Sequence, residues 1–259
     1  MRALAGWIGT VLLLGASVWV ATLDGAGAMT ALQRWTAWLP DGLWWRLTWL
    51  GDAQLALLAY LTAALLWQRN ALTALLWAVL PATLLTHGLK ALAAAPRPAA
   101  VLDPSELHVI GEVLRHGSFP SGHTITAFVL AGCWVLSAPP GWGRVVGWLL
   151  ALPLAAAIGI SRLAVGAHWP LDVVAGALVG WLCAAGAAAV ARRSGSAPGS
   201  RLLFAVAGTL VLLAATLPWR ALPADIVPMA AALGGLALGV VLAGGSTLGQ
   251  RCVEDKHVR

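Results

Sequence analysis

The sequence predicts an all-α fold: a polytopic transmembrane helical bundle with a six-helix core and two further C-terminal spans. Of the 259 residues, 60% are hydrophobic and only 10% are charged, whereas about a quarter of an ordinary soluble domain is charged. Apolar segments close to the ~17–25 residues that a bilayer requires recur along the whole chain. So much apolar surface indicates that lipid is the solvent of this protein.

Eight segments are candidate spans. They cover about residues 4–23, 50–67, 71–92, 121–137, 145–163, 171–191, 202–217 and 226–245. The first is interpreted as an uncleaved helix because it exceeds the apolar region of ~7–15 residues in a signal peptide, which is the alternative. Residues 1–195 are expected to form the six-helix core with an external catalytic face. Residues 196–259 are expected to add two transmembrane helices and a short cytoplasmic tail.

Two other stretches carry expectations about packing. Five tryptophans lie between Trp35 and Trp49, and tryptophan favours the headgroup level, so this stretch predicts an amphipathic helix in the membrane interface. A loop leading into the second span is the alternative. Near the C-terminus, Gly234, Gly235 and Gly239 are compatible with close helix contacts.

The Lys and Arg residues predict the orientation. With both termini in the cytoplasm, nine of them lie in inside segments and seven in outside segments. Three of the outer residues, Lys90, Arg97 and Arg162, belong to a proposed site, and without them the ratio is nine to four. The positive-inside rule favours this orientation. The net charge of +6 does not predict a nucleic-acid partner, because the basic residues form no run or stripe.

Three polar motifs fall at span ends on the external face. They are Lys90-x6-Arg97-Pro98, then Pro120-Ser121-Gly122-His123, then Ser161-Arg162-x5-His168-x3-Asp172. Charged groups between apolar helices are expensive, so such a cluster predicts a functional site. Alone, Lys90 and Arg97 are also compatible with interfacial anchoring, and the proline motif with an ordinary helix start.

The residue types suit phosphate chemistry. Arg162 offers a permanently charged fork to phosphate oxygens. Asp172 can accept a proton from one ring nitrogen of His168, which leaves the other nitrogen free to attack. Asp172 is also expected to raise the pKa of His168, because a carboxylate favours the charged imidazole. A helix that starts at Ser121 and Gly122 presents free backbone N–H groups to an anion, and His123 faces the same opening.

In order and spacing, the three motifs resemble the signature of the type 2 phosphatidic acid phosphatase superfamily. The match spans residues 90–172. The resemblance implies a metal-independent lipid phosphatase with a phosphohistidine intermediate and no cofactor. It implies His168 as nucleophile, Asp172 as its orienting partner and His123 as general acid. The residues it implies as phosphate ligands are Lys90, Arg97, Ser121, Gly122 and Arg162.

The predicted function is hydrolysis of a lipid phosphate or diphosphate of the undecaprenyl diphosphate, phosphatidylglycerol phosphate or phosphatidic acid type. The expected location is a bacterial inner membrane, and the expected partners are the lipid substrate and membrane lipids. A lipid phosphotransferase, in which a second lipid resolves the phosphohistidine, is the nearest alternative. A lipid-phosphate transporter is the alternative from another class. The sequence indicates neither the oligomeric state nor the role of the two C-terminal helices.

Overall fold

The protein is all-helical in the part that the structure describes. The structure is a computed structural model, and it describes residues 2–194, 200–217, 222 and 224–239. Within these ranges there is no strand. The helices are α1 (Arg2–Ala21), α2 (Gly25–Thr36), α3 (Asp41–Trp49), α4 (Ala53–Trp67), α5 (Asn70–Ala93), α6 (Pro98–Val101), α7 (Gly122–Ser137), α8 (Trp142–Val146), the π-helical turn η1 (Gly147–Ala151), α9 (Leu152–Ala164), α10 (Pro170–Arg193) and α11 (Ser200–Thr216). A further helix covers Val227–Gly239.

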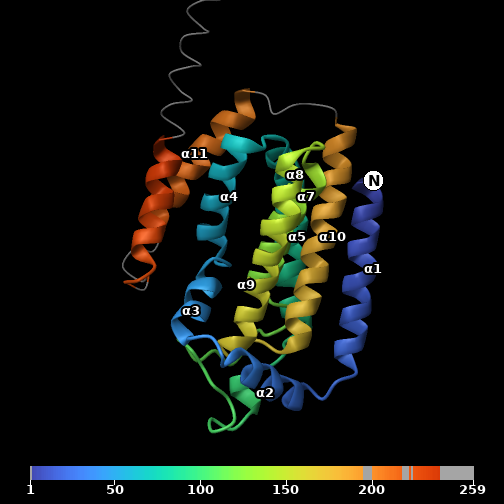
Figure 1. Ribbon diagram of the computed structural model, residues 1–259, viewed down its shortest axis with the longest axis vertical. Helices are drawn as coiled ribbons and strands as arrows, with labels where there is room; N and C mark the ends of the chain where they lie inside the picture. Colours follow the sequence, from blue (N-terminus) through green and yellow to red (C-terminus); the bar gives the residue numbers. More distant parts are fainter. Residues whose placement is uncertain (1, 195–199, 218–221, 223, 240–259) are drawn as a thin grey trace, which may run out of the picture.

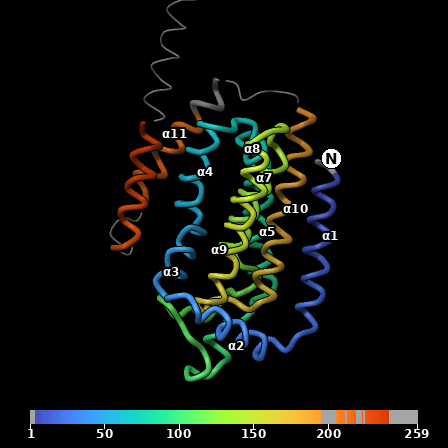
Figure 2. The backbone as a smooth tube through the Cα atoms, in the orientation of Figure 1, coloured from blue at the N-terminus to red at the C-terminus, as the bar shows by residue number. Residues whose placement is uncertain are grey.

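The long helices run side by side, and α10 lies among them (Figures 1 and 2). Helix α10 packs against α1, α5 and α7, while α7 also packs against α9. Helix α1 is tied to α10 by the indole of Trp181, whose Nε1 donates to the carbonyl of Gly6 over 3.0 Å. Short helices α2 and α3 and the segment after α6 cover one end of this bundle, which we call the site end (Figure 1).

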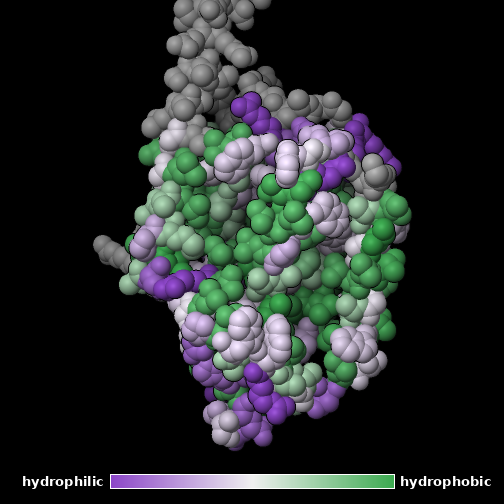
Figure 3. All heavy atoms as spheres, in the orientation of Figure 1, coloured by the Kyte–Doolittle hydropathy of each residue, from purple (hydrophilic) through white to green (hydrophobic). Residues whose placement is uncertain are grey.

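The apolar lengths of the helices fit a polytopic transmembrane bundle. Among the described residues, four helical segments are long and apolar enough to cross a membrane: Leu4–Ala21, Asn70–Val101, Trp142–Ala164 and Pro170–Ser194. Helices α3 and α4 together pass the same test as a pair bent by 68°. Figure 3 shows apolar side chains across the middle of the visible face and hydrophilic ones mainly towards its two ends. The remaining three expected spans correspond to shorter apolar helices.

Helix α7 is shorter than its neighbours α5 and α10, and its N-terminus lies at the site end. It has 16 residues, whereas α5 and α10 have 24 each. Its N-cap is Ser121, whose backbone N–H donates to the carbonyl of Asp172 on α10 over 3.0 Å. The residues ahead of Ser121 form the loop over the site end instead of another helical turn.

The tryptophan-rich stretch forms two helices, where one was expected. Helix α2 begins earlier, at Gly25, because Asp24 caps it by accepting from the N–H groups of Ala26 and Gly27. It ends at Thr36, and α3 starts after Pro40, which suits a helix start but cannot continue a preceding helix. Helix α2 lies across the site end of the bundle (Figure 1).

The C-terminal helices pack on α4 through side chains. Leu55 of α4 forms an apolar cluster with Leu217, Leu222, Ile226 and Ala230. Close contacts at Gly235 and Gly239 are not found among the described residues. A Cβ atom placed on Gly235 or on Gly239 would have nothing within 4 Å. Residues 240–259, including the predicted cytoplasmic tail, lie outside the described residues.

Candidate active site

All three motifs converge at the site end of the bundle. Lys90 lies in the last turn of α5, and its Nζ donates to the carbonyl of Gly117 over 2.5 Å. The first and third motifs meet where Trp169 Nε1 donates to the carbonyl of Pro96 over 2.9 Å. The second and third meet where Ser121 N–H donates to Asp172 O. Motifs that are far apart in the sequence are therefore joined by direct hydrogen bonds.

His168 and Asp172 stand at the start of α10. Trp169 is the N-cap, Pro170 occupies the first turn, and Asp172 is the third helical residue. Both side chains of the pair are buried, and His168 Nδ1 lies 3.4 Å from Asp172 Oδ2. The same carboxylate oxygen accepts from the Trp169 backbone N–H over 2.9 Å. The helix start thus fixes the carboxylate beside the ring.

The other ring nitrogen of His168 faces a cation. Arg97 Nη1 lies 3.4 Å from His168 Nε2 and donates to the carbonyl of Ala167 over 3.0 Å. A guanidinium has only donors, so Nε2 must offer its lone pair and the ring proton must be on Nδ1, towards Asp172. An anion held by Arg97 would therefore arrive at the unprotonated nitrogen.

Burial corrects the expectation for the His168 pKa. Desolvation lowers the pKa of His168 to about 3, and although the hydrogen bond to Asp172 opposes this shift, it does not overcome it. Asp172 does raise the pKa, as expected, but the ring is only 2% exposed, and the larger effect of burial, which disfavours the charged form, was not anticipated. His168 is therefore neutral at physiological pH, as a nucleophile must be.

Arg162 is a buried cation with an unused donor. Its side chain is 7% exposed, and its Nη1 donates to the hydroxyl of Thr48 on α3. Its Nε is buried and has no hydrogen-bond partner among the described residues. A buried unpaired donor on a charged group is costly, so this nitrogen is a candidate donor to an anion.

Lys90 and Arg97 converge on one point of the loop before α7. Both side chains are half-buried, and both donate to the carbonyl of Gly117, from Arg97 Nη2 over 3.3 Å. Arg97 Nε also donates to the carbonyl of His116 over 2.8 Å. Backbone oxygens thus hold the two cations at the site.

The start of α7 supplies the remaining candidates. Ser121 is fully buried, and its Oγ accepts from Thr124 Oγ1 over 2.9 Å, which leaves its own hydroxyl hydrogen for another acceptor. Gly122 and His123 are the first two helical residues, where backbone N–H groups have no partner within the helix. His123 packs against Gly51, since a Cβ at Gly51 would lie 3.1 Å from the His123 ring. His123 is also within electrostatic reach of Arg97, Arg162 and His168.

Two polar residues at the site were not predicted from the sequence. Ser118 is fully buried, and its Oγ donates to Asp172 Oδ2 over 2.5 Å, the shortest contact of that carboxylate. Thr48 is 4% exposed and holds Arg162. Serine and threonine are common in membrane helices and loops, and neither position has a periodic signal. The one indication of a site residue in the sequence was the position of Ser118, two residues before the motif that begins at Pro120.

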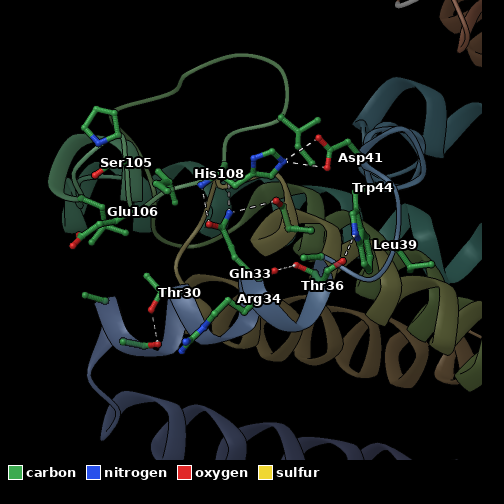
Figure 4. Close-up of a pocket in the computed structure, with 18 residues that line it drawn as sticks. Thr30, Gln33, Arg34, Thr36, Leu39, Asp41, Trp44, Ser105, Glu106 and His108 are labelled. Carbon is green, nitrogen blue, oxygen red and sulfur yellow. Dashed lines mark hydrogen bonds and ion pairs between the residues drawn. The ribbon is translucent and has the colours of Figure 1, made fainter.

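A cavity of about 870 Å³ opens at the site end, between α2, α3 and the segment after α6 (Figure 4). Gln33 Nε2 donates to the carbonyl of His108 over 2.7 Å, and Gln33 Oε1 accepts from the His108 N–H over 3.0 Å. The ring of His108 lies 3.0 Å from the carboxylate of Asp41. These contacts fix the loop over the site end. In the described part of the chain, no group of three His, Cys, Asp or Glu residues could hold a metal ion.

Comparisons with known proteins find similarity over parts of the chain. Two curated relatives match it over short stretches: the bacitracin transport permease protein BcrC of Bacillus licheniformis is 44% identical over 78 residues, covering 29% of this chain and 36% of the relative. The undecaprenyl-diphosphatase of Sulfolobus acidocaldarius is 41% identical over 66 residues, covering 25% and 30%. Human glucose-6-phosphatase 3 is 30% identical over 183 residues, covering 61% and 52%.

The chain spans about half or less of the length of these relatives. The crystal structure of Aquifex aeolicus LpxE is 28% identical, with a TM-score of 0.49 over 59% of this chain and 85% of that one. Residues 71–196 match the family model of the PAP2 superfamily, and this range contains all three motifs. The part of the chain that carries the three motifs, residues 71–196, is therefore assigned to the PAP2 superfamily.

Proposed function

We propose that this protein is a membrane phosphatase that removes a phosphoryl group from a lipid phosphate or diphosphate through a phosphohistidine intermediate. The observation that carries the proposal is the surroundings of His168. Its neutral ring has a carboxylate at Nδ1 and a guanidinium at Nε2, and Arg162 beside it has an unused buried donor. A nucleophile, its orienting partner and anion ligands are what phosphoryl transfer requires.

In the proposed mechanism, His168 Nε2 attacks phosphorus while Asp172 holds the proton on Nδ1. The bond from phosphorus to the lipid oxygen breaks, and that oxygen takes a proton from His123. Water then attacks the phosphohistidine and gives a proton to His123, the N–P bond breaks, and phosphate leaves. Lys90, Arg97, Ser121, Gly122 and Arg162 are the proposed ligands of the phosphoryl oxygens. Their fixed charges stabilise the transition state.

Undecaprenyl diphosphate is the first candidate substrate, because one relative is named as an undecaprenyl-diphosphatase. Phosphatidylglycerol phosphate and phosphatidic acid follow. The test is phosphate release by the purified protein from a panel of these lipids, with EDTA present. Release from at least one lipid is expected to persist under EDTA, because we propose that the cations supply the charge that a metal would otherwise supply. Loss of activity under EDTA with recovery on adding magnesium would contradict the metal-independent mechanism.

The same assay separates two alternatives. A phosphotransferase would release little phosphate in detergent alone and would form a new lipid phosphate when an acceptor lipid is added. A transporter, suggested by the name of the relative BcrC, would bind lipid phosphate without turnover. Phosphate release without an added acceptor would exclude both as the sole activity.

We also propose that the site end faces the outside of a bacterial cell membrane and that both termini are cytoplasmic. Residues 1–195 would then be the catalytic core and 196–259 an added pair of helices with a tail. The support is four arginines at helix ends away from the site motifs: Arg69 precedes α5, Arg144 lies in α8, and Arg192 and Arg193 end α10. With Cys252 replaced by serine, Ser105→Cys should react with an impermeant thiol reagent on intact cells, and Ser194→Cys should not. The reverse pattern would place the site in the cytoplasm.

A further inference from the structure

An apolar groove of about 360 Å³ lies between α4, α7 and α9. Its lining includes Leu50 and Ile158 at the site end and Trp67 and Val146 at the other. The α4 wall from Leu55 to Trp67 is about 18 Å long at the usual rise of a helix. The side chains along it are hydrocarbon or aromatic, and the one hydroxyl, that of Tyr60, is already used by donating to the carbonyl of Ala71 over 3.3 Å. The groove therefore suits a hydrocarbon chain.

The groove begins beside His123. A Cβ atom on Gly51 would lie 2.6 Å from Ile158 Cγ2 and 3.1 Å from the His123 ring. Ile158 and the neighbouring Leu50 line the groove. The absence of a side chain at Gly51 thus lets the proposed general acid and the groove wall meet at one point.

The chemistry decides which part of the substrate lies there. In an in-line displacement the leaving oxygen departs opposite the nucleophile, so it lies away from His168 Nε2 and next to the acid that protonates it. In a lipid phosphate this oxygen carries the hydrocarbon chain. We infer that the groove between α4, α7 and α9 holds the hydrocarbon chain of the lipid leaving group. This inference rests on the proposed function and adds the location of the chain.

A second apolar cavity is the competing location. It measures about 520 Å³, lies between α1, α2, α5 and α10, and is lined by Phe119, Trp169 and Asp172 among others. It therefore reaches the site behind the orienting carboxylate. A chain there would lie on the side of the nucleophile, whereas the leaving oxygen lies on the opposite side of the phosphorus.

Filling the groove tests the inference. Ala63 is half-buried, lines the groove near the middle of α4 and is away from the catalytic residues. The control is Ala156→Phe, because Ala156 is exposed on α9 and does not line the groove. Each methylene displaced from an apolar site weakens binding by about a factor of four, so Ala63→Phe should lower kcat/KM for undecaprenyl diphosphate at least about tenfold. Hydrolysis of p-nitrophenyl phosphate should change less than about twofold, because this substrate has no methylene groups for the phenylalanine to displace.

An equal loss on both substrates, or no loss on the lipid, would overturn the inference. Wild-type protein that releases phosphate from none of the lipids of the panel would instead overturn the proposed function. A measurement without substitutions guards against misfolding: a phosphatidic acid with a diazirine in its acyl chain is crosslinked to wild-type protein. Specific label is the label that is lost when excess phosphatidic acid is added but is kept when excess phosphatidylcholine is added. This specific label should fall on α4 or α9. Such label on α1 or α5 would assign the chain to the competing cavity.

Discussion

The helices that carry the site and the helices after residue 200 are packed in different ways. Between α7 and α10, backbone meets backbone: a Cβ on Gly180 would lie 2.6 Å from the carbonyl oxygen of Ile125, and one on Gly176 would lie 2.9 Å from that of Ser121. A Cβ on Gly235 would meet nothing within 4 Å. Close backbone contact leaves little freedom to slide or tilt, whereas side-chain contacts can adjust.

This difference coincides with the location of the chemistry. Helix α7 starts with Ser121 and His123, and α10 starts with the His168–Asp172 pair. Since a displacement of about 1 Å can cost a catalytic site 10²-fold, the contact that sets the distance between these two helix starts matters most. The C-terminal helices contact α4 and, through the Arg46–Asp225 ion pair, α3. Four substitutions test this contrast.

The largest expected effect is that of His168→Ala, in the tightly packed half. It removes the proposed nucleophile and should lower kcat on the order of 10⁴-fold or more. His87→Ala is the matched control, because His87 is an exposed histidine of α5. Phosphate release and the melting temperature in detergent are measured for both. A folded His168→Ala protein that keeps more than a few per cent of the activity would contradict the phosphohistidine mechanism.

Ser118→Ala should have the next largest effect, because it removes the closest partner of the Asp172 carboxylate. A hydrogen bond to a charged group contributes about 1.5–3 kcal/mol, which corresponds to a loss of about 10- to 100-fold in kcat/KM. The freed carboxylate charge would also favour protonated His168 and so raise its pKa from the wild-type value of about 3. Because protonated His168 cannot attack, the acid limb of kcat/KM should move to higher pH.

Measuring wild type and Ser118→Ala with the same substrate removes the effect of substrate ionisation from the comparison. Ser105→Ala, an exposed serine of the same loop, serves as the control. If Ser118→Ala lowers activity equally at every pH, Ser118 has only a structural role.

The contrast also explains which features could be predicted from the sequence. The convergence of the motifs was predictable, since Lys90, His123 and His168 all fall at span ends on one face. The packing of the helices against one another was not predictable. The glycines singled out in the sequence were Gly235 and its neighbours, yet the close contacts are at Gly176 and Gly180, because a glycine pattern does not show which helix face meets a neighbour. Burial of His168 was equally invisible, so the upward effect of Asp172 on its pKa was predicted but the larger downward effect of desolvation was not.

A smaller effect is expected from Gly180→Ala, which tests the close contact directly. The added methyl must push α7 and α10 apart, because the atom it meets is a backbone oxygen. Overpacking of this kind costs about 1–3 kcal/mol, so the melting temperature in detergent should fall and kcat should fall with it. Gly186→Ala on the same helix is the control, as its Cβ would meet nothing within 4 Å. Equal melting temperatures for the two variants would contradict the rigid contact.

The smallest effect is expected from Gly235→Ala in the C-terminal pair. The methyl group has open space around it in the single chain, and alanine is the better helix former by about 1 kcal/mol. The melting temperature should therefore stay the same or rise slightly, and kcat should not change. If Gly235→Ala lowered stability as much as Gly180→Ala, something outside this chain would have to occupy that space. A second copy of the protein is the simplest occupant, because glycine faces let membrane helices of two chains approach closely. The size of the oligomer in detergent, measured for wild type and variant, would then show whether the C-terminal helices form an interface.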